Sequence, residues 1–210
     1  MTLQNRVTPF GELIADPARG LIYGNRGCLH DAAGRVRRHH ATRRWIACRL
    51  EFRGWHRGPM MQPGKFTELF FLDDATALAA GHRPCALCRR ADYNALAGLW
   101  ADLHGARGTA DAMDERLQAE RLDGAVRRLH TVDAGPLPDG TCVLREGAAW
   151  MVAGGRLRRW TPAGYRESAP FYRGPQQLLT PPSLLALLRS GWRSELALLH
   201  PSAGVAPYLP

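Results

Sequence analysis

The chain lacks any run of eighteen or more consecutive apolar residues among its 210 residues, which is the minimum that a membrane-spanning helix requires. Its first residues also lack the basic start and the apolar stretch of a secretion signal. The apolar content of 45% is normal for a protein that buries a core. From the sequence we therefore expect a globular, cytoplasmic protein with no membrane partner.

The common nucleotide-binding and catalytic motifs are also missing. The sequence contains no Walker phosphate-binding loop, no Gly-x-Ser-x-Gly nucleophile turn, no glycine-rich dinucleotide fingerprint and no pair of histidines on one helix face. ATP-driven and nicotinamide-dependent reactions therefore have no support in the sequence.

Lysine is almost absent, because Lys65 is the one lysine and every other basic residue counted in the net charge is an arginine. The formal net charge of +9 favours a polyanionic partner, since clustered cations release counterions when they meet phosphates. The sequence thus predicts a nucleic-acid partner, with DNA preferred. The same arginine, alanine and glycine content is also typical of a high-GC genome, so a basic surface without a specific partner is the alternative.

Cysteine is present in an odd number, five, with irregular spacing. In a reducing compartment this pattern favours metal ligands or buried thiols over disulfides.

The clearest local pattern lies in residues 66–90. An apolar and aromatic run of strand length, 66–72, precedes Asp73 and Asp74, which offer an N-cap for a short helix over 75–80. Gly81 can end that helix in the left-handed conformation. The Cys85-x-x-Cys88 pair follows, and its spacing places two thiolates on one side of a knuckle around a single zinc ion.

The other half of a four-coordinate zinc site must come from elsewhere in the chain. Cys48 is the first candidate, because its predicted strand over 45–52 is expected to pair with the strand that leads to the knuckle. Cys28 is the second candidate, and His30 and His56 rank third. Two alternatives stay open: Cys48 as an ordinary core thiol, and a reduced Cys-x-x-Cys that only caps a helix.

The segment 75–88, with its alanine-rich helix, glycine and Arg-Pro-Cys-x-x-Cys, resembles the end of the zinc-binding domain of the Ada-type DNA alkylation-repair proteins. The resemblance covers about residues 66–90 and implies zinc ligation by Cys85 and Cys88. The family's two upstream cysteines correspond here to Gly54 and Gly58. One of those cysteines is the methyl acceptor in that family, so methyl-acceptor activity is not implied for this chain.

The chain as a whole resembles a family of uncharacterised bacterial proteins, through a Gly-Asn-Arg-Gly segment at 24–27 and a His-Pro-Ser-Ala segment at 200–203. This second resemblance implies no activity.

The densest positive patch is the segment 35–44, which holds five arginines and two histidines. A solvated basic loop is the ordinary interpretation, and phosphate contact is the functional one. The candidate phosphate-binding residues are Arg26, Arg37, Arg38, Arg43 and Arg44.

The predicted fold class is α+β. We expect an N-terminal unit of β-hairpin, helix and Cys-x-x-Cys knuckle with following helices over 91–104 and 111–129, and then a small antiparallel β-meander with C-terminal helices. The predicted strands of the meander are 141–144, 149–152 and 156–160, with a further strand over 176–179. A proline- and glycine-rich stretch at 133–140 divides an Ada-like region, 1–132, from the second region, 133–210, although both can pack as one domain.

Three functions are compatible with these patterns. The first is a zinc-binding, nucleic-acid-associated protein linked to DNA repair or regulation. The second is a metal-dependent nuclease or other hydrolase that uses His30, Asp31 and Glu68, although no complete nuclease motif is present. The third is a non-catalytic structural or interaction protein.

Overall fold

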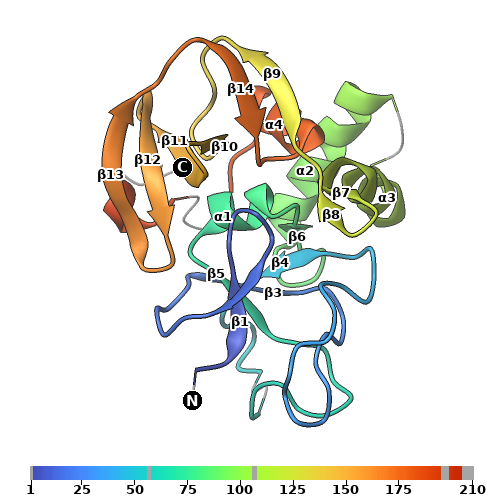
Figure 1. The fold of residues 1–210 in the computed structure, drawn as a ribbon. Coiled ribbons are helices and arrows are strands. Elements are labelled where there is room, and N and C mark those ends of the chain that lie inside the picture. The colour runs from blue at the N-terminus through green and yellow to red at the C-terminus, as the bar shows by residue number, and fades with distance from the viewer. Residues whose placement is uncertain (1, 56–57, 106–107, 195–198, 205–210) are drawn as a thin grey trace.

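The computed structural model describes residues 2–55, 58–105, 108–194 and 199–204. Within these residues the fold class is α+β, as predicted, with two six-stranded sheets, a two-stranded ribbon and four α-helices (Figure 1). The helices are α1 (Asp74–Ala79), α2 (Arg90–His104), α3 (Ala110–Arg121) and α4 (Pro182–Arg189), with a short 3₁₀ turn at Pro201–Ala203.

The first sheet has the strand order β2-β1-β5-β3-β4-β6 and is mixed, because β1 with β5 and β4 with β6 are parallel pairs. Its strands are β1 (Gln4–Val7), β2 (Leu13–Ala15), β3 (Ile22–Asn25), β4 (Ile46–Cys48), β5 (Leu69–Phe71) and β6 (Arg83–Pro84). The ribbon consists of β7 (Leu122–Asp123) and β8 (Val126–Arg127).

The second sheet is antiparallel throughout, in the order β13-β12-β11-β10-β14-β9. Its strands are β9 (His130–Ala134), β10 (Cys142–Arg145), β11 (Ala148–Ala153), β12 (Arg156–Thr161), β13 (Gly164–Pro170) and β14 (Gly174–Leu178).

Helix α1 lies between the two sheets (Figure 1), and all six of its residues are buried. Its Ala75 and Ala79 belong to a hydrophobic cluster with the second sheet, whereas Ala77 packs with the first sheet. Four of its six residues are apolar, and the small alanine side chains let both sheets approach it closely. Its two polar residues are also buried, and each has a partner: Asp74 pairs with Arg89, and the Thr76 hydroxyl donates to Asp73. Asp73 caps its first turn by accepting from the Thr76 amide at 2.8 Å, as the sequence predicts.

Asp73 also ties the two halves of the chain together. Its fully buried carboxylate accepts hydrogen bonds from the Tyr165 hydroxyl and from the His200 amide, each at 2.8 Å. The helix cap is therefore also a link between the strand β13 and the segment that follows α4.

Two buried arginines form three ion pairs that position the residues around the Cys-x-x-Cys segment. Arg83 donates to Asp114 on α3, with a shortest separation of 2.7 Å. Arg89 donates to both Asp74 and Asp92, at 2.6 and 2.5 Å. Each of these guanidinium and carboxylate groups is almost fully buried, so its charge is compensated by its partner and not by water.

The predicted pairing of the strand over 45–52 with the strand over 66–72 is wrong, because β3 lies between β4 and β5 in the sheet. The glycine-rich segment 24–27 therefore ends a central strand. The N-terminal residues form the β1–β2 hairpin, with β2 at the sheet edge.

The predicted helices need smaller corrections. The helix expected over 111–129 ends at Arg121, where the chain turns into the β7–β8 ribbon. The fourth helix begins at Pro182, directly after Pro181, and has no side-chain cap hydrogen bond. A further helix expected around 195–199 falls mainly outside the described residues.

The predicted strands of the meander are confirmed as β10, β11, β12 and β14, while β13 was not predicted. The predicted boundary between residues 132 and 133 falls within β9. The two parts also share a hydrophobic cluster that includes Leu72 and Met151.

No helix in the described part of the chain has both the length and the apolar character needed to cross a bilayer.

Candidate metal centre

Cys48 and the Cys-x-x-Cys pair meet because two short parallel strands lie side by side. β4 pairs with β6 in the register Ile46 to Arg83 and Ala47 to Pro84, and the Cys85 amide donates to the Ala47 carbonyl at 2.9 Å. This register places Cys48, the last residue of β4, beside the residue that follows β6. Proline at position 84 is compatible with this place because β6 is the outermost strand of the sheet.

The Sγ atoms of Cys48, Cys85 and Cys88 all lie within 4.8 Å of one another. Among the described residues this is the one group of three or more His, Cys, Asp or Glu side chains with ligand atoms this close together. Thiolates bound at about 2.3 Å to one tetrahedral ion stand about 3.8 Å apart. Small side-chain rotations would therefore bring the three sulfur atoms onto one ion, so these residues can hold a metal ion.

Hydrogen bonds among the three cysteines favour ionisation of one of them, Cys85, whereas the pKa values of Cys48 and Cys88 are raised. The thiols of Cys48 and Cys88 point at Cys85, and these hydrogen bonds hold the pKa of Cys85 well below its usual range. The pKa of Cys48 is raised, first because its thiol donates to Cys85. One shared thiolate is thus favoured even before a cation is present, and a bound cation would allow the other two thiols to ionise.

Arg49 orients the third cysteine through two hydrogen bonds. Its amide donates to the Cys88 sulfur at 3.4 Å, and its Nε donates to the Cys88 carbonyl at 3.0 Å. Such outer contacts fix the direction of a ligand and are part of most metal sites. Cys48 is buried, whereas Cys85 and Cys88 are partly exposed, so an ion could reach the cluster from the side of the knuckle.

The other predicted zinc ligands take different places. Cys28 is outside the cluster, and its thiol faces the His30 carbonyl at 3.6 Å. Both ring nitrogens of His30 are engaged, one with the Thr67 hydroxyl at 2.6 Å and one with the Gln62 carbonyl at 3.2 Å. His56 lies outside the described residues.

The three candidate residues of a hydrolase are not gathered around one position. Asp31 accepts from the side chains of Arg35 and Arg37, and Glu68 accepts from the Met61 amide at 2.7 Å. Neither they nor His30 belongs to a potential metal-binding group within the described residues. Their hydrogen bonds give all three residues a structural role within this part of the chain.

Four of the predicted phosphate-binding arginines are on the surface. Arg37, Arg38, Arg43 and Arg44 are all exposed. Arg37 pairs with Asp31 at 2.8 Å, Arg44 with Asp111 at 3.2 Å, and Arg43 with Glu115 at 3.9 Å. Exposed ion pairs of this kind contribute only about 0–1 kcal/mol to stability, so a phosphate can replace the carboxylate partners.

Arg26 is in the interior and does not belong to this surface group. Its side chain is fully buried, donates to the His82 ring and to the Gly11 carbonyl, and lies 3.8 Å from the centre of the Trp45 ring. Arg121 also lies over Trp45, at 4.0 Å. A phosphate cannot reach Arg26 in this arrangement, and burial lowers the pKa of its guanidinium.

Sequence reasoning missed β6 and the roles of Arg49 and Arg89. A two-residue strand has no periodicity to detect, so β6 gives no signal of its own. The only available signal was the position of both arginines, each directly after a candidate cysteine.

The fold and the site together define an α+β protein with a three-cysteine cluster that can hold a metal ion. Comparison with known proteins adds no relative, because no family model, no curated protein and no solved structure matches this chain.

Proposed function

We propose that this chain is a zinc-binding protein that associates with nucleic acid, DNA in preference, and that has no methyl-acceptor activity. The observation that carries the proposal is the convergence of Cys48, Cys85 and Cys88 from two separate segments of the chain. The packing of a hydrophobic core does not require three thiols to lie together, whereas a soft metal ion is bound by several thiolate ligands around one position.

Zinc fits this donor set better than the other common divalent ions. Thiolate sulfur selects zinc, copper(I) and iron–sulfur clusters, while magnesium and calcium take oxygen ligands. The Ada-type resemblance of residues 66–90 also implies zinc at Cys85 and Cys88. Three protein sulfurs leave one tetrahedral position for a further ligand.

The place of the cluster in the fold supports a structural role for the ion. The ion would join β4 to the segment after β6, and Arg89, the residue after the third cysteine, donates to Asp74 at the start of α1. The metal centre would therefore hold the edge of the first sheet against the helix between the two sheets. This structural role accounts for the position of the metal centre without a catalytic step.

The nucleic-acid part of the proposal is supported by charge. The net charge is +9, and the exposed arginines at 37, 38, 43 and 44 lie within eight consecutive residues. Arg38 has no acidic partner among the described residues, and its neighbours hold only weak surface pairs. Such a group is suited to contacts with the phosphate backbone, which carry affinity without sequence specificity.

Replacing these four arginines with alanine should weaken DNA binding and flatten its salt dependence. Each lost phosphate contact lowers the slope of log K against log salt by about 0.9 for duplex DNA, so we expect a decrease of about 2–4 units. The measurement is fluorescence anisotropy of a labelled duplex titrated at several salt concentrations.

The matched control replaces four exposed arginines of the second sheet region, Arg156, Arg159, Arg166 and Arg173, which removes the same net charge from a different surface. If both quadruple variants lose the same affinity and slope, the binding is a general effect of net charge. If the unchanged protein does not bind DNA at all, the nucleic-acid part of the proposal is wrong and an interaction or structural role takes its place.

A further inference from the structure

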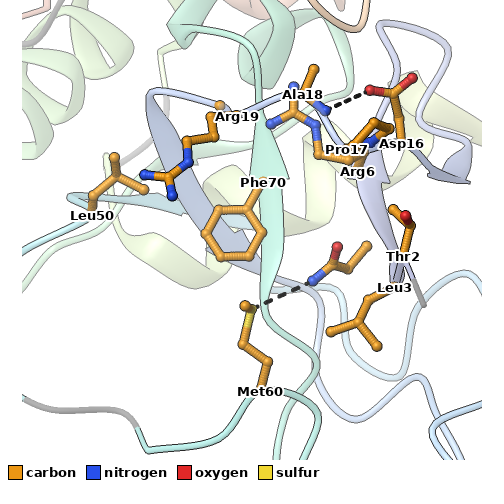
Figure 2. A pocket seen from close by; sticks show the side chains of 12 residues that line it. Thr2, Leu3, Arg6, Asp16, Pro17, Ala18, Arg19, Leu50, Met60 and Phe70 are labelled. Carbon is orange, nitrogen blue, oxygen red and sulfur yellow. Dashed lines mark hydrogen bonds between the residues drawn. The ribbon is translucent and has the colours of Figure 1, made fainter.

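A pocket of about 480 Å³ opens beside the strands β1 and β5 (Figure 2). One of its lining residues, Leu50, lies two positions after Cys48 in the sequence. It is lined by residues from the N-terminal strand, from the segment before β3, from β5 and from the segment between β4 and β5. The lining includes Leu3, Arg6, Asp16, Arg19, Leu50, Met60 and Phe70. Pockets of this size hold small molecules or single groups of a larger ligand.

The walls of the pocket are mainly apolar and include one aromatic ring. Figure 2 shows the Phe70 ring in the middle of the lining residues, with Leu50 on one side and Met60 below it. Phe70 is partly exposed, and the Tyr23 ring packs against it edge-on with centroids 5.8 Å apart. Tyr23 therefore fixes the orientation of the Phe70 ring, whose remaining surface faces the pocket.

The upper wall in Figure 2 carries polar groups. The guanidinium groups of Arg6 and Arg19 and the carboxylate of Asp16 lie above Phe70. Arg6 is 4% exposed and donates through Nη2 to the Pro162 carbonyl, while its Nε and Nη1 meet no acceptor among the described residues. Arg19 is exposed. Donors, one acceptor and a net positive charge thus stand at the rim of an apolar pocket.

Between the lining residues Leu50 and Met60 in the sequence, the described residues 52–55 carry aromatic and basic side chains. Trp55 lies midway between Leu50 and Met60 in the sequence and is 59% exposed. The Phe52 ring packs edge-on against Trp55 at 5.5 Å, and the Arg53 guanidinium lies 5.0 Å from the Phe52 ring. Exposed aromatic rings interleaved with arginines are the arrangement on which single-stranded nucleic acids stack their bases.

The geometry points to a binding site for single-stranded nucleic acid in which one unstacked base enters the pocket against Phe70 and the strand continues over Trp55. Arg19 would contact the neighbouring phosphate, and Arg6 would supply positive charge behind the base. The inference rests on the proposed association with nucleic acid and adds a site at which bases, and not only phosphates, are bound.

The test compares two labelled single strands with equal numbers of phosphates. One is a twelve-residue oligothymidylate, and the other is the same backbone with abasic sites throughout. Base stacking contributes roughly 1–3 kcal/mol per base, so we expect the oligothymidylate to bind at least about tenfold more tightly in fluorescence anisotropy. Phe70→Leu and Trp55→Ala should each reduce that preference by at least about fivefold.

Tyr172→Ala is the matched control, because Tyr172 is an aromatic residue of similar exposure, 52%, in the second sheet region. It should leave the preference unchanged. Each variant is first shown to keep the unfolding temperature of the unchanged protein, so that a lost preference reports on the pocket.

The outcomes separate this inference from the proposed function. Equal affinity for the two strands overturns the base pocket and leaves phosphate binding in place, whereas binding of neither strand overturns the association with nucleic acid itself. If free thymidine monophosphate competes at the same concentration as the oligonucleotide, the pocket binds a free nucleotide and the assignment to a strand is wrong.

Discussion

Replacing Cys85 with serine should lower the midpoint of thermal unfolding by about 6–12 °C. The variant removes one sulfur from the three-cysteine cluster and would remove most of its affinity for the proposed zinc ion. Structural zinc sites contribute much of the folding free energy of small domains. Because this chain also has a hydrophobic core, we expect the ion to contribute a smaller amount, about 3 kcal/mol. For a protein of this size, each kcal/mol changes the midpoint by about 2–4 °C. Differential scanning calorimetry measures the change.

Cys28→Ser is the matched control, because Cys28 is a partly exposed thiol outside the cluster. It should keep the midpoint of the unchanged protein within about 2 °C, since it leaves the sulfur cluster intact. The unchanged protein should also lose stability when a strong chelator removes its metal, and Cys85→Ser should not respond to the chelator. A Cys85→Ser variant as stable as the unchanged protein would show that no ion stabilises the fold.

Replacing Arg89 with methionine should lower the free energy of unfolding by about 3–5 kcal/mol. The change leaves the carboxylates of Asp74 and Asp92 buried without their shared cation, and burial of uncompensated charge has a cost of this size. Ser194 also loses its Arg89 partner. Because Asp74 begins α1, the loss should reach both sheets. Urea unfolding followed by tryptophan fluorescence gives the free energy.

Arg90→Met provides the comparison, because Arg90 is the next residue and is exposed. It should change the free energy of unfolding by less than about 0.5 kcal/mol. Adding Asp74→Asn and Asp92→Asn to Arg89→Met removes the unpaired charges and should recover part of the loss. Equal effects of Arg89→Met and Arg90→Met would mean that the buried ion pairs contribute little to stability.

The sequence was most informative where local chemistry decides the structure. The cap at Asp73, the short alanine-rich helix and the Cys-x-x-Cys segment are close together in the chain, and the structure contains all three. The sequence favours Cys48 over Cys28 as the third sulfur, and the cluster has that composition. The predicted strand pairing is wrong, however, since the strand of Cys48 pairs with β6 and not with β5.

The features that the sequence could not predict depend on contacts between distant segments. Arg26 belongs to a turn with a typical surface composition, yet its side chain is buried because Trp45, His82 and the Gly11 carbonyl surround it. The position of β3 between β4 and β5 likewise follows from tertiary pairing that no local pattern records. The helical pattern beyond Arg121 is overridden by the β7–β8 ribbon: the backbone is already extended at Leu122, with φ −133° and ψ 145°, and Gly124, with a φ of 60°, turns the chain between the two strands.

The metal centre, the exposed arginines and the pocket belong to one half of the molecule. Cys48 ends β4, and Leu50 begins the lining of the pocket two residues later. An ion at the cluster would hold the start of the segment that carries Phe52 and Trp55. We therefore propose that zinc positions a nucleic-acid surface and takes no part in chemistry itself.

The most direct test of this account is the metal content of the purified, untagged protein, measured by inductively coupled plasma mass spectrometry alongside the Cys48→Ala and Cys28→Ala variants. The account predicts about one zinc ion per chain, retained in Cys28→Ala and lost in Cys48→Ala. Absence of metal from every preparation, or loss of zinc in Cys28→Ala with retention in Cys48→Ala, would contradict it.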